Sequence, residues 1–379
     1  MKPLLVIAGE ASGDLHGAEI LRALKVQNPD LRIVGIGGSA MSPFLDRKLA
    51  DVNDLAVVGF AEVLKHIPGL IRLKRDILRI ARQEGVGAVL FIDYPGFNLN
   101  LAKAFRKQLP TLRLHWYVCP QVWAWKAGRI PVLGRTLDTL YCLFDFEPRL
   151  FEGLPVEALW LGNPLVETTV AEVDRATFFA ETGLDPKRPL VALLPGSRKD
   201  EVRRLLPSLV ELVRDWSQDP QRQSIQWVLP LASTLTRARL EAFIGDVPIV
   251  LVENRAYAAR AHADAALVCS GTATLETALL GTPFAILYRL KALSYHVAKR
   301  FVKLAHFGLV NIVAGRLLAP ELLQDEVNPA RLGQELARLL EPETAARMRA
   351  DFLEVRSHLG EPGAAERVAE HLLSKMPSA

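Results

Sequence analysis

The sequence predicts an α/β protein built from two doubly wound parallel-sheet domains. Short apolar runs without polar alternation, typical of buried parallel strands, alternate with helical patterns along the chain. This alternation starts at Leu4 and starts again at Leu190, after the segment Gly162-Asn163-Pro164 interrupts it. The chain has 379 residues, half of them hydrophobic, so it is long enough for two domains with sizeable cores.

Buried strands are expected wherever such an apolar run is bounded by turn residues. In the first half these runs are 4–8, 32–35, 88–92, 114–118, 139–144 and 158–161. In the second half they are 190–194, 226–229, 249–252 and 265–269, with a last strand that follows Gly281-Thr282-Pro283 and ends at Tyr288. Helical patterns separate most of them, as in a sheet that is covered on both faces.

The loop after the first strand, GEASGD, turns sharply into a helix. It lacks the G-x-G-x-x-G spacing, so a dinucleotide site is not predicted. Small residues there leave the backbone open to a ligand. An isolated histidine near a helix start is more often a cap or a surface residue, and that alternative stays open for His16. The candidates in this loop are the small residues Gly9, Ser12 and Gly13 and the reactive side chains Glu10, Asp14 and His16.

Asp93 directly follows the strand expected at 88–92. Ligands of open α/β sheets bind at the carboxyl ends of the strands, so Asp93 is a candidate general base. Tyr94-Pro95-Gly96 forces a turn, and Asn98 is expected to start the next helix. The equal alternative is a carboxylate that only satisfies the amides of this turn.

The second half contains two candidate phosphate-binding features. Pro195-Gly196-Ser197 is a tight loop that delivers Arg198, whose guanidinium offers several donors to a diphosphate. Ser270-Gly271-Thr272 precedes a helix, and a helix N-terminus carries roughly half a positive charge. Glu276, about one turn further, is placed to accept hydrogen bonds from a ribose diol. The alternative is an ordinary capped helix on which Glu276 is a solvated surface residue.

Two kinds of segment suggest contact with a lipid or sugar. The stretch 115–130 holds Trp116, Trp123 and Trp125 beside Lys126 and Arg129, a combination found at sugar sites and lipid interfaces. Loop packing is the alternative. Two helices carry basic stripes, and each basic side chain near an anionic bilayer contributes roughly 1 kcal/mol. Solvated helix faces remain the alternative for these stripes, which are Arg72, Arg75, Arg79 and Arg82, and His296, Lys299, Arg300 and Lys303.

Net charge, cysteine spacing and hydropathy argue against a nucleic-acid binder, a zinc protein and a membrane-spanning protein. A net charge of +4 argues against a general nucleic-acid binder. Cys119, Cys142 and Cys269 have no CxxC partner and no histidine at metal-ligand spacing, so buried thiols in a reducing compartment are expected, without a structural zinc site. The N-terminal apolar run is too short for a signal peptide, and no segment is long enough to span a bilayer. A soluble or peripheral protein is expected.

A set of motifs, in order along nearly the whole chain, resembles the lipid-A-disaccharide synthase family. They are AGEASGD at 8–14, D-x-P-x-F-N at 93–98, PQVWAWKAGRI, FEP at 146–148, LLPGSRKDEV, SGTATLETALLGTP, and NIVAGRLLAPELLQ at 311–324. The family often has serine at Cys119 and histidine at Asn163. The second departure puts any role of a histidine at that hinge in doubt.

The resemblance implies an inverting glycosyltransferase of the GT-B type, with two Rossmann-like domains facing across a cleft. Its reaction joins UDP-2,3-diacylglucosamine to 2,3-diacylglucosamine 1-phosphate and gives a β-1,6-linked disaccharide phosphate and UDP. No metal and no cofactor are implied, since UDP is part of the donor. The implied location is the cytoplasmic face of the inner membrane of a Gram-negative bacterium, on anionic lipids, without nucleic acid. Acyl-chain length and the choice between monomer and homodimer stay open.

The resemblance also implies roles for single residues. Asp93 is the expected base, with Glu10 as second choice. The diphosphate is expected at Arg198, Ser197 and the helix start 270–272, and the ribose at Glu276. Asn311 and Arg316 are carried over as further substrate contacts. Acyl chains need an apolar surface on the first domain, next to the stripe Arg72, Arg75, Arg79 and Arg82, with Trp123 and Trp125 nearby.

The expected domains are an acceptor domain at 1–165 and a UDP-sugar domain at 166–341. The last helices, from about 342 to 379, are expected to cross back onto the first domain. Three alternatives share this fold or its donor site: a UDP-GlcNAc 2-epimerase, the muramyl-lipid glucosaminyltransferase and a non-catalytic UDP-binding module. The glucosaminyltransferase would need a longer Gly-rich loop than Gly9 to Gly13 provides.

Overall fold

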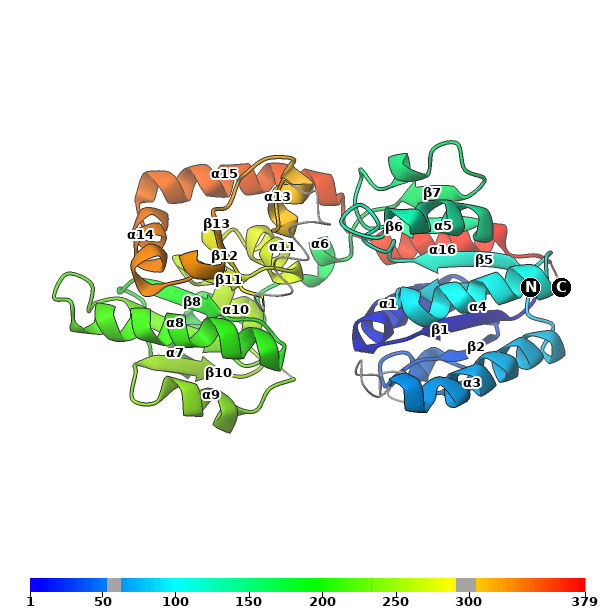
Figure 1. Cartoon of the computed structure of the whole chain (residues 1–379), viewed down its shortest axis with the longest axis horizontal. Helices are drawn as coiled ribbons and strands as arrows, with labels where there is room; N and C mark the ends of the chain where they lie inside the picture. Colours follow the sequence, from blue (N-terminus) through cyan, green and yellow to red (C-terminus); the bar gives the residue numbers. More distant parts are fainter. Residues whose placement is uncertain (53–62, 233, 291–304, 379) are drawn as a thin grey trace. The chain divides into compact units, whose positions relative to one another are not determined.

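The computed structural model describes residues 1–52, 63–232, 234–290 and 305–378 (Figure 1). In this part of the chain, two compact units are formed, each around its own parallel sheet. The first unit comprises Met1–Pro164 and Gly360–Ala379, and the second comprises Leu165–Leu359. The second basic stripe expected from the sequence, on residues 296–303, lies outside the described residues.

The first unit contains a seven-stranded sheet in the order β3-β2-β1-β4-β5-β6-β7, with every neighbouring pair parallel. The strands are β1 (Leu4–Ala8), β2 (Ile33–Ile36), β3 (Arg47–Ala50), β4 (Ala88–Ile92), β5 (Arg113–Tyr117), β6 (Thr139–Cys142) and β7 (Glu157–Trp160). The helices are α1 (Ala11–Gln27), α3 (Val63–Gln83), α4 (Pro95–Gln108), α5 (Ile130–Thr136) and α16 (Ala364–Lys375).

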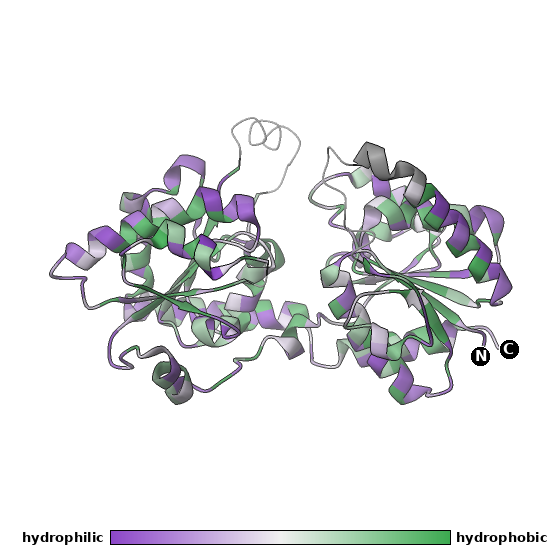
Figure 2. Cartoon of the chain, turned by 90° about the horizontal axis from the view of Figure 1, so that it is seen from below, coloured by the Kyte–Doolittle hydropathy of each residue, from purple (hydrophilic) through white to green (hydrophobic). Residues whose placement is uncertain are grey.

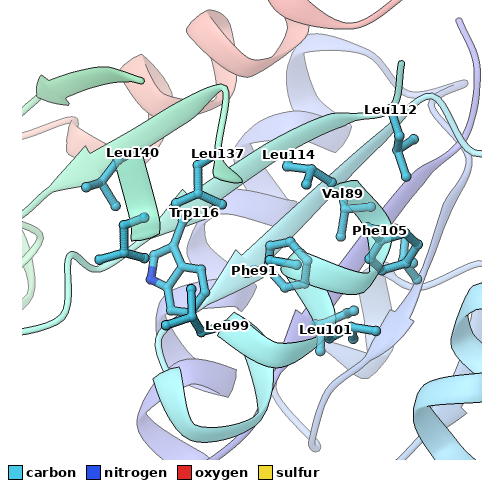
Figure 3. Close-up of a cluster of buried hydrophobic side chains, with 14 of the residues drawn as sticks. Val89, Phe91, Leu99, Leu101, Phe105, Leu112, Leu114, Trp116, Leu137 and Leu140 are labelled. Carbon is cyan, nitrogen blue, oxygen red and sulfur yellow. The ribbon is translucent and has the colours of Figure 1, made fainter. Parts of the chain in front are cut away.

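Hydrophobic cores lie on both faces of this sheet, because successive residues of a strand point to opposite sides. Leu4 and Val6 of β1 pack with α1 and α16, whereas Leu5 and Ile7 pack with α3 and α4. Figure 3 shows the second core, in which strand residues such as Phe91 meet Phe105 of α4. Figure 2 shows hydrophobic residues on the strands inside each unit and hydrophilic residues on the outer faces of the helices.

The second unit contains a six-stranded parallel sheet in the order β10-β9-β8-β11-β12-β13. The strands are β8 (Leu190–Leu194), β9 (Gln226–Pro230), β10 (Ile249–Val252), β11 (Ala265–Cys269), β12 (Phe284–Tyr288) and β13 (Glu321–Leu323). The helices are α6 (Leu165–Thr168), α7 (Arg175–Thr182), α8 (Lys199–Gln218), α9 (Arg237–Ile244), α10 (Ala256–Ala261), α11 (Thr272–Leu279), α13 (Leu309–Ala314), α14 (Pro329–Leu339) and α15 (Pro342–Leu359).

The structure corrects the point at which the chain returns to the first unit. We expected this return at about residue 342, but it occurs at Gly360, and α15 packs against α11, α13 and α14 of the second unit. Phe352 of α15 stacks on Phe284 with ring centroids 5.6 Å apart, and Met348 is also buried. These apolar contacts hold α15 in the second unit, and only α16 crosses back, against α1.

Two edge strands were not expected from the sequence. β3 has the sequence RKLA and is largely solvent-exposed, so it lacks the apolar run by which the other strands were recognised. β13 is only three residues long. Neither strand therefore offers the continuous buried apolar run that predicted the other strands.

Each sheet has a topological switch point, where the strand order reverses. In the first unit this point lies between β1 and β4, whose following helices α1 and α4 belong to the cores on opposite faces. In the second unit it lies between β8 and β11. Ligands of doubly wound sheets bind beyond the carboxyl ends of the strands at this position. Among the described residues, no helix has both the length and the hydrophobicity to cross a bilayer.

Candidate active site

Asp93 and Glu10 lie at the switch point of the first unit, because Asp93 follows β4 directly and Glu10 is the second residue after β1. Asp93 and Tyr94 both have left-handed backbone conformations, with φ values of 45° and 50°. Such conformations cost roughly 1–3 kcal/mol each for residues other than glycine, and they gather at functional sites. The Asp93 amide donates to the Tyr117 carbonyl at 2.9 Å, which holds the strained turn on the end of β5.

Contacts of Gly9 and Asn98 explain why these two residue types occur at the ends of β1 and β4. A Cβ on Gly9 would lie 2.2 Å from the Tyr94 ring, so the close approach of the two loops requires glycine at this position. The Asn98 side-chain amide donates to the Asp93 carbonyl at 2.8 Å and, over longer distances, to carbonyls of Ile92 and Ile7. Asn98 therefore ties together the ends of β4 and β1.

The structure corrects the expectation that Asn98 starts a helix. α4 begins at Pro95, after Tyr94 as the N-cap residue, and Asn98 is fully buried inside it. Proline favours the first turn of a helix, where no amide hydrogen is needed.

The pKa of the candidate base Asp93 is raised by its surroundings. Burial has the largest effect, the negative charge of Glu10 adds to it, and together they raise the pKa of Asp93 to about 6. Ser12 donates from its hydroxyl to a carboxylate oxygen of Glu10 at 2.9 Å, which orients Glu10 at the start of α1. A carboxylate whose pKa lies close to neutral pH is suited to take up a proton during a reaction.

Asp14 and His16 have different surroundings from those expected of reactive groups. Asp14 is buried and accepts hydrogen bonds from the amides of Gly38, Ala40 and Met41 at 2.6–3.1 Å. It is a structural residue, which corrects its listing among the reactive side chains of this loop. His16 packs edge-on against Tyr117, and burial lowers its pKa, so it is neutral at pH 7.

In the second unit, Arg198 follows β8 and precedes α8. Its side chain is 83% exposed and pairs with Glu201, one turn into α8, at 2.9 Å. Gly196 has a φ of 104°, and a Cβ on it would lie 2.4 Å from a Glu201 oxygen, so glycine is required where the loop folds over the helix start. Ser197 is exposed, and its carbonyl accepts a hydrogen bond from the Thr234 hydroxyl.

The start of α11 lies beyond the neighbouring strand β11, on the other side of the switch point. Ser270 donates from its hydroxyl to the Phe307 carbonyl at 3.0 Å. Gly271 is the N-cap with a φ of 145°, and among the described residues no atom lies within 4 Å of the position of a Cβ on it. The exposed Thr272 begins the helix. Space and a helix N-terminus therefore coincide here, as an anion requires.

Glu276 has partners that the sequence analysis missed. It is 17% exposed and forms an ion pair with Arg260, which is 10% exposed, and the Tyr257 hydroxyl donates to it at 3.2 Å. Arg260 and Tyr257 both lie on α10, so the pair joins two helices that the sequence separates. The interpretation of Glu276 as a fully solvated residue is wrong. Its carboxylate is fixed in one orientation and keeps acceptor capacity for a further donor.

Asn311 and Arg316, expected as further substrate contacts, both have protein partners in the structure. Asn311 is fully buried, donates to Ala319 and Glu321 at 2.8 Å, and accepts from the amides of Leu318 and Ala319. These four hydrogen bonds use the whole capacity of an amide side chain. Arg316 pairs with Asp351 and Glu354 of α15, both at 2.8 Å, and these partners raise its pKa. Both residues therefore make structural contacts, and their role as substrate contacts stays a prediction.

Replacing Asn311 by alanine is expected to destabilise the protein. Each buried polar group left without a partner costs about 1–3 kcal/mol, so we expect the free energy of unfolding to fall by about 2–4 kcal/mol. Urea unfolding measures this change. Arg316→Ala is the control, since an exposed ion pair contributes less than about 1 kcal/mol. Equal losses in the two variants would contradict the structural role of Asn311.

The three tryptophans of the segment 115–130 have three different environments. Trp116 is fully buried in the core, and Trp123 is half-buried, donating to Glu147 at 3.0 Å and packing against Phe146. Burial raises the pKa of Glu147 to about 7. Trp125 is 54% exposed, with the Lys126 ammonium 4.1 Å from the ring centroid. Of the two tryptophans expected at a lipid or sugar, only Trp125 presents its ring to solvent.

The basic stripe of α3 is exposed along its length, at Arg72, Arg75, Arg79 and Arg82. Arg79 pairs with Asp76 at 2.7 Å, and Arg82 donates to Gln108 at 2.7 Å. Ile77, Leu78 and Ala81 on the other side of the helix are buried in the core. The stripe is therefore a solvent-facing cationic surface on an amphipathic helix.

Comparison with known proteins gives a consistent result at the level of the whole chain. A family model described as lipid-A-disaccharide synthetase matches residues 4–373. The lipid-A-disaccharide synthase of Myxococcus xanthus (strain DK1622) is 39% identical over 378 residues, which cover 99% of this chain and 97% of the relative. That of Geobacter sulfurreducens (strain ATCC 51573 / DSM 12127 / PCA) is 36% identical, covering 98% and 97%.

Solved structures share the fold at low sequence identity. A UDP-GlcNAc 2-epimerase from Neisseria meningitidis bound to UDP-GlcNAc has a TM-score of 0.66 at 13% identity, covering 99% of this chain and 100% of that one. A glycosyltransferase from Rickettsia africae ESF-5 has a TM-score of 0.58 at 10% identity, covering 99% of each. At these identities the likeness concerns the fold alone.

Proposed function

The chain belongs to the lipid-A-disaccharide synthase family, and from this premise we propose which residues carry out its reaction. It is a glycosyltransferase of lipid A biosynthesis with a Rossmann-like GT-B fold. The observation that carries this function is the match of the family model to residues 4–373. The two sheets, which each place polar residues at a switch point, agree with it. We propose UDP-2,3-diacylglucosamine as donor and 2,3-diacylglucosamine 1-phosphate as acceptor.

In the proposed reaction, the 6-hydroxyl oxygen of the acceptor attacks the anomeric carbon of the donor. The bond between that carbon and the phosphate oxygen breaks, and its electron pair leaves with UDP. The hydroxyl proton goes to a carboxylate, so one base and one anion-binding site suffice. Attack from the side opposite UDP inverts the anomeric configuration, giving a β-linked product.

Asp93 is the proposed base. It is held by a strained turn at the end of β4, and burial with Glu10 raises its pKa to about 6. Glu10 has two effects in this account: its charge raises the proton affinity of Asp93, and it is the second candidate for the base.

Arg198, Ser197 and the start of α11 are proposed to hold the diphosphate. The Arg198 guanidinium is exposed and is proposed to exchange Glu201 for a phosphate, with charge-assisted hydrogen bonds in both cases. Ser270, Gly271 and Thr272 offer hydroxyls and the positive end of a helix dipole. Glu276, oriented by Arg260 and Tyr257, is proposed to accept from the ribose hydroxyls. In this scheme no metal ion is needed to neutralise the leaving group.

The basic stripe of α3 and the exposed Trp125 are proposed to hold the enzyme at the cytoplasmic face of the inner membrane. Four exposed arginines near an anionic surface contribute roughly 1 kcal/mol each. The acyl chains of both substrates belong to the same membrane, so this contact would bring the enzyme to them. The stripe supports reversible, salt-sensitive binding.

The proposed base predicts an acid limb in the pH profile. Asp93 must be deprotonated to accept the hydroxyl proton, and its pKa is raised to about 6. We therefore expect kcat/KM to be constant near neutral pH and to fall about tenfold per pH unit below about pH 6. Steady-state rates in buffers of constant ionic strength measure this. A rate that stays constant down to about pH 4, the ordinary value for aspartate, would exclude a raised pKa of the base.

Release of UDP with each substrate set tests the function itself. We expect purified protein in the presence of a chelator to release UDP only when both the donor and the acceptor lipid are present. An epimerase would change the donor without the acceptor. A binding module would release no product with either set, and either result would overturn the assignment.

A further inference from the structure

Two thiols and one carboxylate, none of them assigned a role in the reaction above, come together in the first unit. The ligand atoms of Cys119, Cys142 and Glu147 all lie within 4.8 Å of one another, and the three residues are buried. No structural zinc site was expected from the sequence, because the cysteines form no CxxC pair and have no histidine at metal-ligand spacing. The sheet removes that separation: Tyr117 of β5 pairs with Tyr141 of β6, which brings the loops after both strands together.

We propose that Cys119, Cys142 and Glu147 form a structural binding site for one zinc-like divalent cation. Tetrahedral zinc takes thiolate sulfurs at about 2.3 Å and carboxylate oxygens at about 2.0–2.2 Å. Those distances put neighbouring ligand atoms somewhat less than 4 Å apart, so the three groups reach them by small side-chain rotations. A water molecule takes the fourth position.

Binding exchanges protons for the cation. Each of the two thiols releases one proton to solvent, as does the Glu147 carboxyl where it is protonated, and the two thiolates and the carboxylate donate electron pairs to the cation. The protons leave to solvent, and no electron is transferred. Soft thiolates favour zinc over magnesium or calcium.

The carboxylate is already oriented as the ligand of a metal would be. Leu143 and Phe144 donate from their amides to one oxygen of Glu147 at 2.9 and 3.1 Å, and the Trp123 indole donates to the other at 3.0 Å. Such second-shell hydrogen bonds fix the direction of metal ligands and are a regular part of metal sites. The Cys119 thiol donates to the Pro120 carbonyl at 3.4 Å and the Cys142 thiol to the Leu140 carbonyl at 3.9 Å, and the two thiols also lie within hydrogen-bonding reach of each other.

A cation here would connect two loops of the first unit. Cys119 belongs to the loop that carries Trp123 and Trp125, and Cys142 ends the strand before the loop that carries Glu147. The site lies beside the proposed base, since β5 is the neighbour of β4, but it shares no residue with it. The metal would therefore stiffen the loops and take no part in the transfer.

Cobalt is the probe for this site, because cobalt bound by thiolates absorbs in the near ultraviolet and visible ranges. Full-length protein is reduced, freed of metal with a chelator that is then removed, and titrated with Co²⁺ and afterwards with Zn²⁺. We expect one Co²⁺ per chain with a thiolate charge-transfer band, displacement of the band by Zn²⁺, and a higher midpoint of thermal unfolding with Zn²⁺.

Single substitutions test whether Cys119, Cys142 and Glu147 are the ligands of the cation. Cys119→Ser and Cys142→Ser are expected to abolish the band, and Glu147→Gln to weaken the affinity by at least about tenfold. Cys269→Ser is the matched control: this third buried thiol lies in the second unit and must leave the band intact. Absence of the band in the wild type, or its survival in Cys119→Ser, would overturn the proposal.

X-ray absorption of the zinc-loaded wild type tests the same point without any variant. The expected coordination shell holds two sulfur and two oxygen or nitrogen atoms. A shell without sulfur would overturn the proposal, as would rapid formation of a Cys119–Cys142 disulfide in air that zinc does not prevent.

Discussion

Asp93→Asn is expected to lower kcat by about a hundred- to ten-thousand-fold while the affinity for UDP stays unchanged. Asparagine has nearly the same shape but cannot accept the proton of the attacking hydroxyl. The change also removes a buried carboxylate whose pKa is raised by burial and by Glu10, so the fold is not expected to suffer. Single-turnover rates give the chemical step, and calorimetric titration with UDP gives the affinity.

Two further variants make this result specific. Asp76→Asn changes an exposed aspartate of α3 that pairs with Arg79, and it should leave the rate unchanged. Glu10→Gln keeps Asp93 but removes the charge beside it, so the acid limb of the pH profile should move to lower pH. Full activity of Asp93→Asn together with an inactive Glu10→Gln would move the base to Glu10.

Arg198→Ala is expected to weaken UDP binding by about 10- to 100-fold. Hydrogen bonds to charged groups contribute about 1.5–3 kcal/mol, and each 1.4 kcal/mol corresponds to a factor of ten. The side chain is exposed and its partner Glu201 belongs to the same helix start, so the variant should keep its stability. Calorimetric titration with UDP, and with uridine as a ligand without phosphate, measures the loss.

The control for Arg198 is Arg203→Ala in the same helix. Arg203 is also exposed and also pairs with a carboxylate of the first turn, Asp200, at 3.1 Å. It should bind UDP like the wild type. The loss in Arg198→Ala should be absent with uridine, because the guanidinium is proposed to contact the diphosphate. Equal losses with UDP and uridine would exclude that contact.

Much of the fold could be predicted from the sequence, because its strands are buried on both faces and therefore appear as short apolar runs. The position of Asp93 followed from the same rule, since a polar residue directly after a buried strand lies at the carboxyl edge of the sheet. The same holds for Ser270 after β11, whereas Arg198 is separated from β8 by the loop 195–197.

Interactions between distant segments could not be predicted in the same way. The pairing of Glu276 with Arg260 depends on how two helices pack, and no sequence spacing encodes it. Asp14 accepts hydrogen bonds from backbone amides 24–27 residues away, and Asn311 is held by backbone groups 7–8 residues away and by the side chain of Glu321. The residue type alone did not show these hydrogen bonds.

The measurement that tests the central claim most directly is the linkage in the product. Protein in chelator, given UDP-2,3-diacylglucosamine and 2,3-diacylglucosamine 1-phosphate, is predicted to form UDP and a disaccharide phosphate whose new bond is β-1,6 by nuclear magnetic resonance. That configuration requires a single inverting attack, for which one base at Asp93 suffices. An α-linked product would contradict the one-base mechanism, and the absence of any disaccharide would contradict the proposed substrates.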